Sequence, residues 1–347
     1  MSPGAERVLA ERELNRALLE RQFLLTRKKV SVPKTLERIG GIQAQYAPSI
    51  YIGLWSRLAG FQLDALTNAL ERRTVVQGTL MRATIHLVSA GDFGPMSAGI
   101  RDARRKAWLD YRRGTFSEDE VKEAAATVRK RLKAGEQERK ALMEGMNNAL
   151  FNGANVWLDI VRVPPSGTWE RRRADLYALA DDWLGPSRAS AADGRELLVR
   201  RYLQGFGPAA PKEISDWAGL KVRPVEEAVA GMELRRLRDE GGGLLVDLPR
   251  APLPSGDEPA PVRFLPTWDA TLLVHARRTQ ILPEEHRAKV FNSKTPHSVP
   301  TFTVDGQVAG SWRYEKGRVG LSPFGRLTKE IRAEVEAEAE RLAALHH

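Results

Sequence analysis

The chain has 347 residues, with 54 Lys and Arg against 44 Asp and Glu, and therefore a formal net charge of +10 at pH 7. It has no cysteine, which excludes disulfides, thiolate nucleophiles and cysteine metal sites, and its six histidines show no HExxH-like spacing. No apolar run approaches the roughly 20 residues that span a bilayer, and the N-terminus lacks the apolar core of a signal peptide. We therefore expect a cytoplasmic protein without a metal. Its positive charge favours a polyanionic partner, because Lys and Arg that neutralise phosphates release counterions.

Residues 1–90 begin a recurring order of helices followed by a short β-hairpin. Apolar residues at helical spacing predict helices over "LNRALLERQFLL", after Pro33 and over "QLDALTNALERR". The β-rich runs "VVQGTLMR" and "TIHLVS" then predict two strands joined by a short turn. Three helices and a hairpin form a winged helix, which can bind DNA through one helix and the hairpin.

Two further units repeat this order. In 91–190 the spacing predicts helices over 91–112, 117–133 and 138–151, and "NVWLDIVRVPPSGTWERRRADLY" predicts a hairpin with a basic wing. In 191–250, "GRELLVRRYLQGFGPAAPKEISDWAGL" and "RPVEEAVAGM" predict three helices, and "LRRLRDEGGGLLVDLP" predicts a hairpin. We expect three tandem winged-helix units.

The C-terminal segment, 262–347, is β-rich. "VRFLPTWDATLLVH", "TFTVDGQVAGSWRY" and "GRVGLSP" predict strands, with turns at Asp305-Gly306 and Lys316-Gly317, and a charged helix is expected over 328–344. The predicted fold class is helix-rich α+β, with the three winged-helix units and this segment arranged around a DNA-binding channel. A regulator would need a sensing or dimerisation domain, so we expect a monomer.

The stretch "GGIQAQYAPSIYIGLW", residues 40–55, places Gln43 and Gln45 where a helix runs toward Pro48. Residues two apart on a helix point about 200° away from each other. Both amides can therefore face one substrate only if the backbone leaves helical geometry, which Gly40-Gly41 and Pro48 favour.

These residues carry a resemblance to a known family. "LNRALLERQFLL", "IGGIQAQYAPSIYIGLWSRL", "LMRATIHLVSAGDF" and "FLPTWDATLLVHARRTQIL" resemble the AlkZ-type bacterial DNA glycosylases, which are built from tandem winged helices. Members excise N7-alkylated purines, and some unhook interstrand crosslinks or give self-resistance to alkylating natural products. The family's catalytic signature is Gln, an apolar residue, then Gln, which Gln43-Ala44-Gln45 matches. The sequence departs from the family near Ala276-Arg277, where an acidic residue is expected.

The resemblance implies a DNA repair enzyme without a cofactor, acting on double-stranded DNA that carries alkylated purines. Neutral glutamine cannot exchange a proton at pH 7, so Gln43 and Gln45 can only hold and polarise a water. An N7-alkylated purine is already cationic and leaves without a general acid. No lysine stands out as a Schiff-base nucleophile, so we expect a monofunctional enzyme. We also expect the negative end of the preceding helix dipole to favour the developing positive charge.

Two further residues are candidates for the substrate pocket. His86 in "TIHLV" is either a strand histidine with a satisfied ring or a contact to the lesion. Asp269 in "PTWDATLL" is either a buried hydrogen-bond acceptor that orients a loop or a carboxylate near the sugar. In both cases the structural interpretation is the more common one.

The remaining candidates lie on hairpins. Arg171, Arg172 and Arg173 on the second wing form either a solvated charged face or a set of phosphate contacts. In "VDGQVAGSWRYEKGR", Trp312 could stack on an adduct and Arg313 could contact DNA, with core packing as the alternative.

Two functions without catalysis stay open. A winged-helix regulator would require a dimer and a palindromic site. A protein that binds and protects adducts would release no free base.

Overall fold

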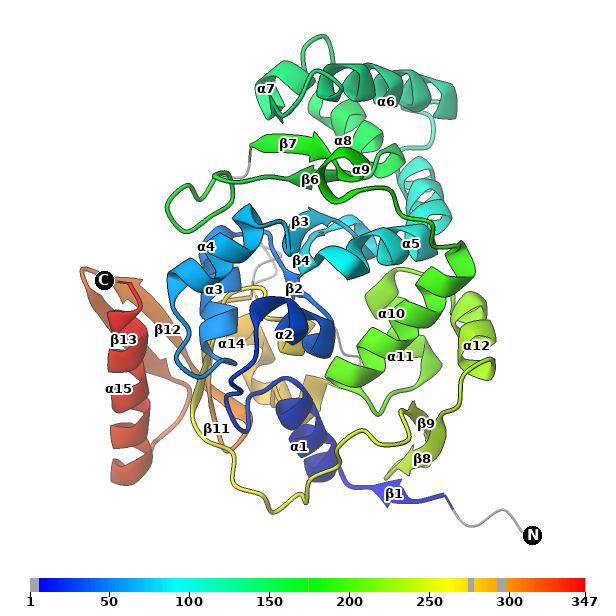
Figure 1. Ribbon diagram of the computed structural model, residues 1–347. Helices are drawn as coiled ribbons and strands as arrows, with labels where there is room; N and C mark the ends of the chain where they lie inside the picture. The colour runs from blue at the N-terminus through cyan, green and yellow to red at the C-terminus, as the bar shows by residue number, and fades with distance from the viewer. Residues whose placement is uncertain (1–5, 174, 274–277, 292–297, 347) are drawn as a thin grey trace.

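A computed structural model of the chain describes residues 6–173, 175–273, 278–291 and 298–346. These residues form a mixed α+β fold with more helix than strand, as predicted (Figure 1). The family departure at Ala276-Arg277 lies outside the described residues. Across the described ranges, no helix has the length and apolar character needed to cross a membrane.

The first 90 residues contain the predicted helices and hairpin and one additional helix that was not predicted. The predicted third helix is α4, but α3 precedes it, and the hairpin strands β3 and β4 follow. The bounds are β1 Val8–Leu9, α1 Glu11–Arg21, α2 Val32–Ile39, β2 Ile42–Gln43, α3 Ala47–Trp55, α4 Leu63–Glu71, β3 Val75–Thr79 and β4 Ile85–Ser89.

The next segment departs most from the sequence prediction. The helix predicted over 138–151 is interrupted at Gly145, which has a φ of +75°, so that α7 and α8 are separate. α8 also continues to Trp157, and residues 163–173 form a long loop in place of the predicted tight hairpin turn. The bounds are α5 Ala90–Tyr111, α6 Glu118–Leu132, β5 Gln137–Glu138, α7 Arg139–Leu142, α8 Asn148–Trp157, β6 Ile160–Arg162, β7 Leu176–Leu179 and α9 Ala180–Leu184.

A single six-stranded sheet joins these two parts of the chain. Its order is β2-β4-β3-β6-β7-β5, and all its pairings are antiparallel. β3 contacts β6 through the pairs Gln77 with Arg162 and Gly78 with Val161. Gly78 is needed there, because a Cβ on it would lie 2.4 Å from a ring carbon of Phe93. The short strand β2, which carries Gln43, is at one edge of this sheet.

Residues 191–250 follow the predicted order of three helices and a hairpin. Their bounds are α10 Ala191–Phe206, α11 Pro211–Ala218, α12 Val222–Ala230, β8 Arg235–Asp239 and β9 Leu244–Asp247. The N-terminal strand β1 pairs in parallel with β8, so both ends of the first 250 residues meet in one small sheet (Figure 1).

The C-terminal segment confirms both predicted turns. Asp305, Gly306, Lys316 and Gly317 all have φ between +45° and +80°, the geometry of a two-residue hairpin turn that matches strand twist. The strand predicted over "VRFLPTWDATLLVH" is only three residues long and is followed by a helical turn. The bounds are β10 Arg263–Leu265, α13 Ala270–Leu273, α14 Arg287–Val290, β11 Thr301–Val304, β12 Gln307–Glu315, β13 Arg318–Pro323 and α15 Lys329–Ala344.

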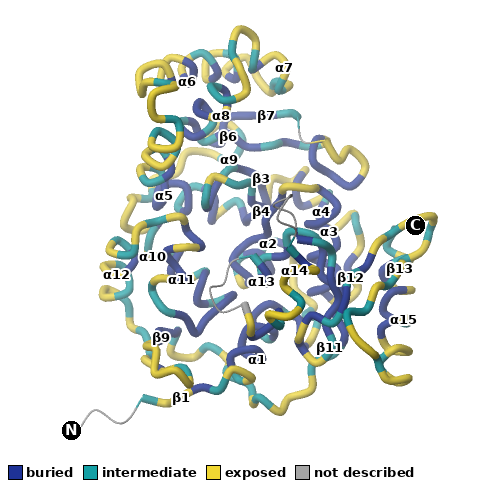
Figure 2. Tube along the Cα trace, turned by 180° about the vertical axis from the view of Figure 1, so that it is seen from behind, coloured by how far each residue is buried: buried dark blue, intermediate teal, exposed yellow. Residues whose placement is uncertain are grey.

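The buried core runs through the middle of the molecule and thins toward the helices at its ends. Figure 2 shows the central strands and the helices beside them as buried, whereas α6 and α7 are exposed on their outer side. The motif segment lies between α2 and α3, inside the buried central region.

Candidate active site

Two glycines turn the chain out of α2 just before the glutamine motif. Gly40 and Gly41 both have left-handed φ angles, of +80° and +78°. A Cβ on Gly41 would lie 2.9 Å from Cγ1 of Val88 and 3.0 Å from the carbonyl oxygen of Leu87, so a larger residue would be strained and crowded. The backbone leaves helical geometry before the motif, as the sequence predicts.

The motif itself is extended. Gln43 pairs with His86 across β2 and β4, and the backbone N–H of Ala44 donates to the Ile85 carbonyl at 2.7 Å. This geometry removes the opposed orientation that a helix would impose on Gln43 and Gln45. The sequence predicted the break in the helix. It did not predict that Gln43 lies in strand β2 and that Gln45 lies in the bend after this strand.

The motif lies between the ends of two helices in the chain. α2 ends at Ile39, and Gln45 precedes Tyr46, the N-cap of α3, so a negative C-terminal end precedes the motif and a positive N-terminal end follows it. The contribution of the α2 dipole to the developing charge stays a prediction.

The side-chain amides of the two motif glutamines differ from those of the buried Gln22 and Gln77. Gln22 donates to the carbonyl oxygens of Ile39 and Gly205, and Gln77 donates to that of Gly167 at 3.0 Å. Gln43 is 6% exposed and Gln45 is exposed, yet within the described ranges neither side-chain amide has a protein partner. Since a buried polar group normally has a hydrogen-bond partner, the amide of Gln43 is available to a water or a substrate.

His86 lies on β4 directly opposite Gln43 and is neutral at physiological pH. Burial, followed by the charge of Arg82, lowers the pKa of His86 to about 3. Its Nδ1 is 3.0 Å from the Thr84 carbonyl oxygen, which a neutral ring can satisfy by donating the Nδ1 proton. Nε2 is then left as an acceptor, and the ring carries no positive charge beside the motif.

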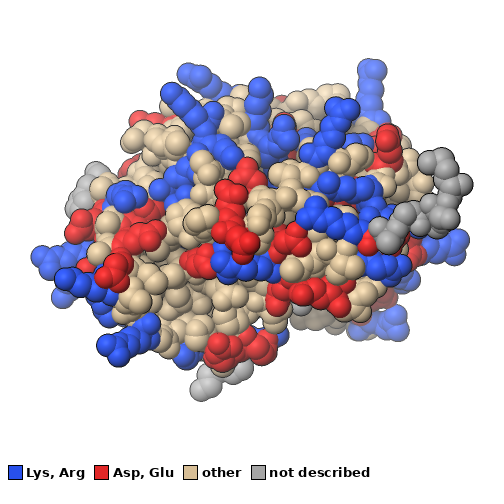
Figure 3. All heavy atoms as spheres, turned by 90° about the horizontal axis from the view of Figure 1, so that it is seen from below, with Lys and Arg blue, Asp and Glu red and all other residues tan. Residues whose placement is uncertain are grey.

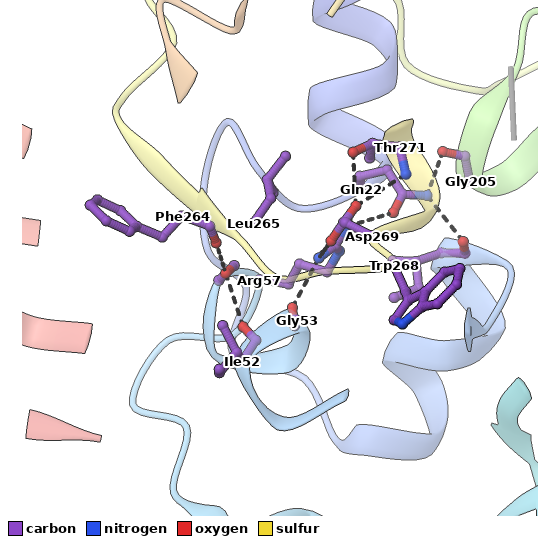
Figure 4. Close-up of polar contacts among 12 residues, drawn as sticks. Gln22, Ile52, Gly53, Arg57, Gly205, Phe264, Leu265, Trp268, Asp269 and Thr271 are labelled. Carbon is purple, nitrogen blue, oxygen red and sulfur yellow. Dashed lines mark hydrogen bonds and ion pairs between the residues drawn. The ribbon is translucent and has the colours of Figure 1, made fainter. Parts of the chain in front are cut away.

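Asp269 is held by a buried ion pair with Arg57 (Figure 4). The guanidinium donates to both carboxylate oxygens, at 2.9 and 3.0 Å, and the N–H and hydroxyl of Thr271 donate to Oδ1. Burial raises the pKa of Asp269, but the charge of Arg57 and these hydrogen bonds outweigh it and hold the pKa below its usual value.

The Arg57–Asp269 pair links the end of α3, the helix that follows the glutamine motif, to the C-terminal segment. Arg57 also donates to the Gly53 carbonyl of α3 at 3.0 Å, and Ser56 donates to the Phe264 carbonyl next to it (Figure 4). These contacts correspond to the structural interpretation of Asp269, a buried acceptor that orients a loop. Figure 4 also shows Gln22 beside the pair, where its Oε1 accepts from Arg57 at 3.1 Å.

Two hollows flank the motif, and we name them by their linings. The aromatic hollow has a volume of about 730 Å³ and begins at Tyr46, the residue after Gln45. It is lined by Tyr46, Pro48, Ser49, Ile52, Arg172, Pro266, Thr267, Val299, Pro300, Ser311, Trp312, Arg313, Tyr314, Gly320, Leu321, Ser322 and His346.

The arginine hollow has a volume of about 420 Å³ and reaches the motif through Ile85 and Arg162, both of which contact the backbone of Ala44. It is lined by Gly78, Thr79, Ala83, Ile85, Trp108, Tyr111, Arg112, Arg139, Phe151, Asn152, Asn155, Val156, Ile160, Arg162 and Tyr177. Neither set of described lining residues includes a carboxylate.

The hairpin candidates divide between core and surface. Trp312 is 6% exposed and donates from Nε1 to the Leu265 carbonyl at 3.0 Å, so most of its ring packs in the core while part of it lines the aromatic hollow. Arg313 is exposed and forms an ion pair with Glu315 at 2.9 Å. Its side chain reaches the rim of the same hollow.

Arg171, Arg172 and Arg173 are exposed on the 163–173 loop. Arg171 lies 3.3 Å from Asp175 and 3.7 Å from Glu138, and the guanidinium of Arg172 lies over Trp169 at 5.5 Å. Arg172 and Arg173 have no described carboxylate partner, and Arg172 lines the aromatic hollow. The structure thus brings Arg172, Trp312 and Arg313 to one hollow and leaves Arg171 in an ion pair.

Net charge alone does not locate a DNA-binding surface on this protein. On the face seen from below, lysine and arginine side chains project along one edge, but acidic side chains lie among basic ones over the rest (Figure 3). The aromatic and arginine hollows are distinguished by having no carboxylate in their linings.

Sequence reasoning missed several residues of the site. Arg57 follows Trp55 in an otherwise apolar run, and nothing in that run marks it as the partner of Asp269. Arg112, Arg139 and Arg162 are separated in sequence and reach one hollow only through the folding of α5, α7 and β6. Their common property, the lack of an acidic partner, is visible only in three dimensions.

Two comparisons with known proteins found matches. A sequence model of the "DNA glycosylase AlkZ-like" family matches residues 36–345. The chain belongs to the AlkZ-like DNA glycosylase family. Its fold is similar to that of the Streptomyces sahachiroi DNA glycosylase AlkZ, with a TM-score of 0.82 and 18% sequence identity over 97% of each chain. A comparison with curated protein sequences gives no match.

Membership in the AlkZ-like family makes this chain a DNA glycosylase, with DNA as its substrate. The matched region contains the whole motif segment, the Arg57–Asp269 pair and the lining of both hollows except His346. The described residues contain no group of His, Asp and Glu side chains that could hold a metal ion.

Proposed function

We propose that the protein is a monofunctional glycosylase that hydrolyses the N-glycosidic bond of cationic N7-alkylated purines in double-stranded DNA. One observation carries the proposal. Gln43 and Gln45 have side-chain amides without partners among the described residues, and Tyr46 and Ile85, which adjoin the motif, line two hollows whose linings contain no carboxylate. Such a site can hold a water but has no charged acid or base beside it.

This chemistry requires a leaving group that is already activated. A neutral hydrogen bond contributes about 1 kcal/mol net, and a preorganised one about 3 to 4 kcal/mol. Enzymatic accelerations begin near 8 kcal/mol, so two amides fall short on an intact nucleoside. N7-alkylation supplies the difference, because the cationic purine accepts the electrons of the breaking bond.

The proposed reaction is a hydrolysis at C1′. The C1′–N9 bond breaks, its electron pair neutralises the cationic ring, and the alkylated purine leaves as a neutral base. The oxygen of a water held by Gln43 and Gln45 forms the new bond to C1′, and its proton passes to solvent. Neutral His86 adds no positive charge to this site, where the sugar becomes oxocarbenium-like.

The two hollows suggest how damaged DNA is held. We propose that the three predicted winged-helix units form the walls of a DNA channel around the motif. The aromatic hollow, with Tyr46 at its motif end and Trp312 in its wall, is large enough for bulky adducts and for the linker of an interstrand crosslink. In this proposal His86 and Asp269 contribute to the substrate pocket beside the motif. Arg171, Arg172, Arg173 and Arg313 contact the phosphate backbone of the DNA. A single chain supplies the whole site, and we expect a monomer acting on cytoplasmic, nucleoid DNA.

Release of free base by the purified protein tests the proposal. An oligonucleotide duplex containing one N7-methylguanine should yield free 7-methylguanine, detected by chromatography. Borohydride should trap no covalent protein–DNA adduct, because hydrolysis by water forms no Schiff base. A protein that binds the same duplex but releases no base would instead be a non-catalytic regulator or an adduct-binding protein.

A further inference from the structure

Several buried or half-buried arginines of this protein are paired with carboxylates, and the arginines of the arginine hollow are not. Elsewhere, Arg21 contacts Asp247, Arg57 contacts Asp269 and Arg201 contacts Asp92, each through two hydrogen bonds. Taking a guanidinium out of water is costly unless an anion compensates it. In each of these three pairs a carboxylate compensates the charge of the guanidinium.

In the arginine hollow no described carboxylate compensates the guanidinium charges. Arg112, Arg139 and Arg162 are all half-buried, and none forms an ion pair with a described carboxylate. Arg139 donates to the neutral amide oxygen of Asn148 at 3.2 Å, and Arg162 hydrogen-bonds the side chain of Tyr177 and has a weak contact of 3.5 Å to the Ala44 carbonyl. Burial lowers the pKa of Arg162, as it does for a cation without a nearby carboxylate.

Two unpartnered polar atoms lie in the same lining. Nε of Arg112 and Oδ1 of Asn155 are buried and have no hydrogen-bond partner among the described residues. Beside Arg112, the Tyr111 ring is 79% exposed, and the guanidinium lies 4.9 Å from its centroid. The hollow thus offers three cations, an amide and an exposed aromatic ring.

We propose that the arginine hollow is a nucleotide subsite for the DNA strand, in which Arg112, Arg139 and Arg162 hold a phosphodiester and Tyr111 stacks on an adjacent base. A phosphodiester supplies the missing negative charge, and arginine forks match phosphate oxygens in two hydrogen bonds. A base can stack on Tyr111 whatever its sequence, because every base has a π face.

The position of the hollow connects this subsite to the glutamine motif. Ile85 accepts from the N–H of Ala44 and also lines the hollow, and Arg162 contacts the carbonyl of the same residue. The lining comes from strands β6 and β7 of the six-stranded sheet and from the helices α5, α7 and α8 (Figure 1). A phosphodiester held there would fix the strand in register next to Gln45. The inference rests on the proposed function only in that DNA is the partner.

Binding to undamaged duplex tests the subsite without requiring excision. The test variant is Arg112→Gln with Arg139→Gln, and the control is Arg113→Gln with Lys140→Gln. The control removes the same charge from neighbouring exposed positions, of which Arg113 is already paired with Asp110. Dissociation constants are measured at several salt concentrations for both proteins and for wild type.

We expect the test variant to lower the slope of log K against log salt by about one unit, the amount for one released phosphate contact, and the control to leave it near the wild-type value. Tyr111→Ala should weaken binding by roughly ten-fold with the slope unchanged, because stacking involves no counterion, and Tyr111→Phe should bind as wild type does. Equal slopes for the test variant and the control would overturn the inference.

Two further arms separate the alternatives. Competition by inorganic phosphate or by deoxyadenosine monophosphate, lost in the test variant while the DNA slope is unchanged, would mean that the hollow takes a free phosphate compound and would contradict the DNA assignment. Release of 7-methylguanine is measured in parallel. A wild type that releases none would contradict the proposed function alone, whereas normal release with equal slopes would contradict the subsite alone.

Discussion

The glutamine motif and the Arg57–Asp269 pair differ in how their polar groups are paired, although only one helix, α3, separates Gln45 from Arg57 in the chain. The pair is charged and buried, with both carboxylate oxygens of Asp269 occupied by Arg57 and Thr271. The motif is uncharged, and its amides have no partners among the described residues. The charged pair is held by protein contacts, whereas we propose that the open amides act on the substrate. The predictions below test this difference.

Removing the carboxylate of the pair should have the largest effect. Asp269→Ala leaves Arg57 buried and unpaired, which should lower the free energy of unfolding by about 3 to 5 kcal/mol. Chemical denaturation measures this loss. Asp247→Ala breaks the comparable buried contact with Arg21 and is the matched control. Both variants should lose similar stability, and normal stability of Asp269→Ala would show that the pair is not structural.

Removing a motif amide should affect the rate and leave the fold unchanged. Gln45→Ala should slow release of 7-methylguanine by about 10² to 10³-fold, the effect of losing one preorganised donor or acceptor, with an unchanged unfolding midpoint. Single-turnover kinetics measure the rate. Gln62→Ala, which changes another exposed glutamine, should keep the wild-type rate. Loss of stability in Gln45→Ala would place this residue with the structural group.

The buried histidine should make stability depend on pH. The folded pKa of His86 is about 3, below its ordinary value of about 6.5, so the unfolded chain binds a proton first as the pH falls. Between pH 6.5 and 3 the free energy of unfolding should therefore decrease, by at most about 1.4 kcal/mol per pH unit from this residue. Denaturation of wild type and His86→Gln between pH 6.5 and 5 measures the difference. Parallel curves for the two proteins would contradict a neutral, buried His86.

The smallest effect concerns the exposed second wing. Arg173 has no described carboxylate partner, whereas Arg171 is paired with Asp175. If the wing contacts phosphate, Arg173→Gln should reduce the salt slope of DNA binding by about one unit for every sequence alike. Arg200→Gln on α10, which removes a charge already paired with Glu196, is the control. The same slope in both variants would leave the wing as a solvated face.

Local sequence signals predicted the parts of the fold that local physics decides. The turns at Asp305-Gly306 and Lys316-Gly317, the helix over 328–344 and the element order of 191–250 all agree with the structure. The signals failed where tertiary contacts decide. "NVW" has a strand-like composition but ends α8, where Phe151 and Val156 of the same helix are buried.

The site was predictable only in part for the same reason. Gly40-Gly41 marked a break in the helix, and the spacing of Gln43 and Gln45 marked the motif. That β2 would pair the backbone of Gln43 with that of His86 depends on a strand more than 40 residues away in the chain. The partner of Asp269 and the three arginines of the hollow have no sequence spacing that links them, so only the folded chain reveals them.

The rate of base release as a function of base charge tests the central claim most directly. Duplexes carrying either cationic N7-methylguanine or a neutral base such as uracil are compared in single-turnover assays with wild type and Gln43→Ala/Gln45→Ala. We predict release of the cationic base alone, and its loss in the double variant. Release of the neutral base at a similar rate, or an unchanged rate in the double variant, would contradict hydrolysis by uncharged amides on a preactivated purine.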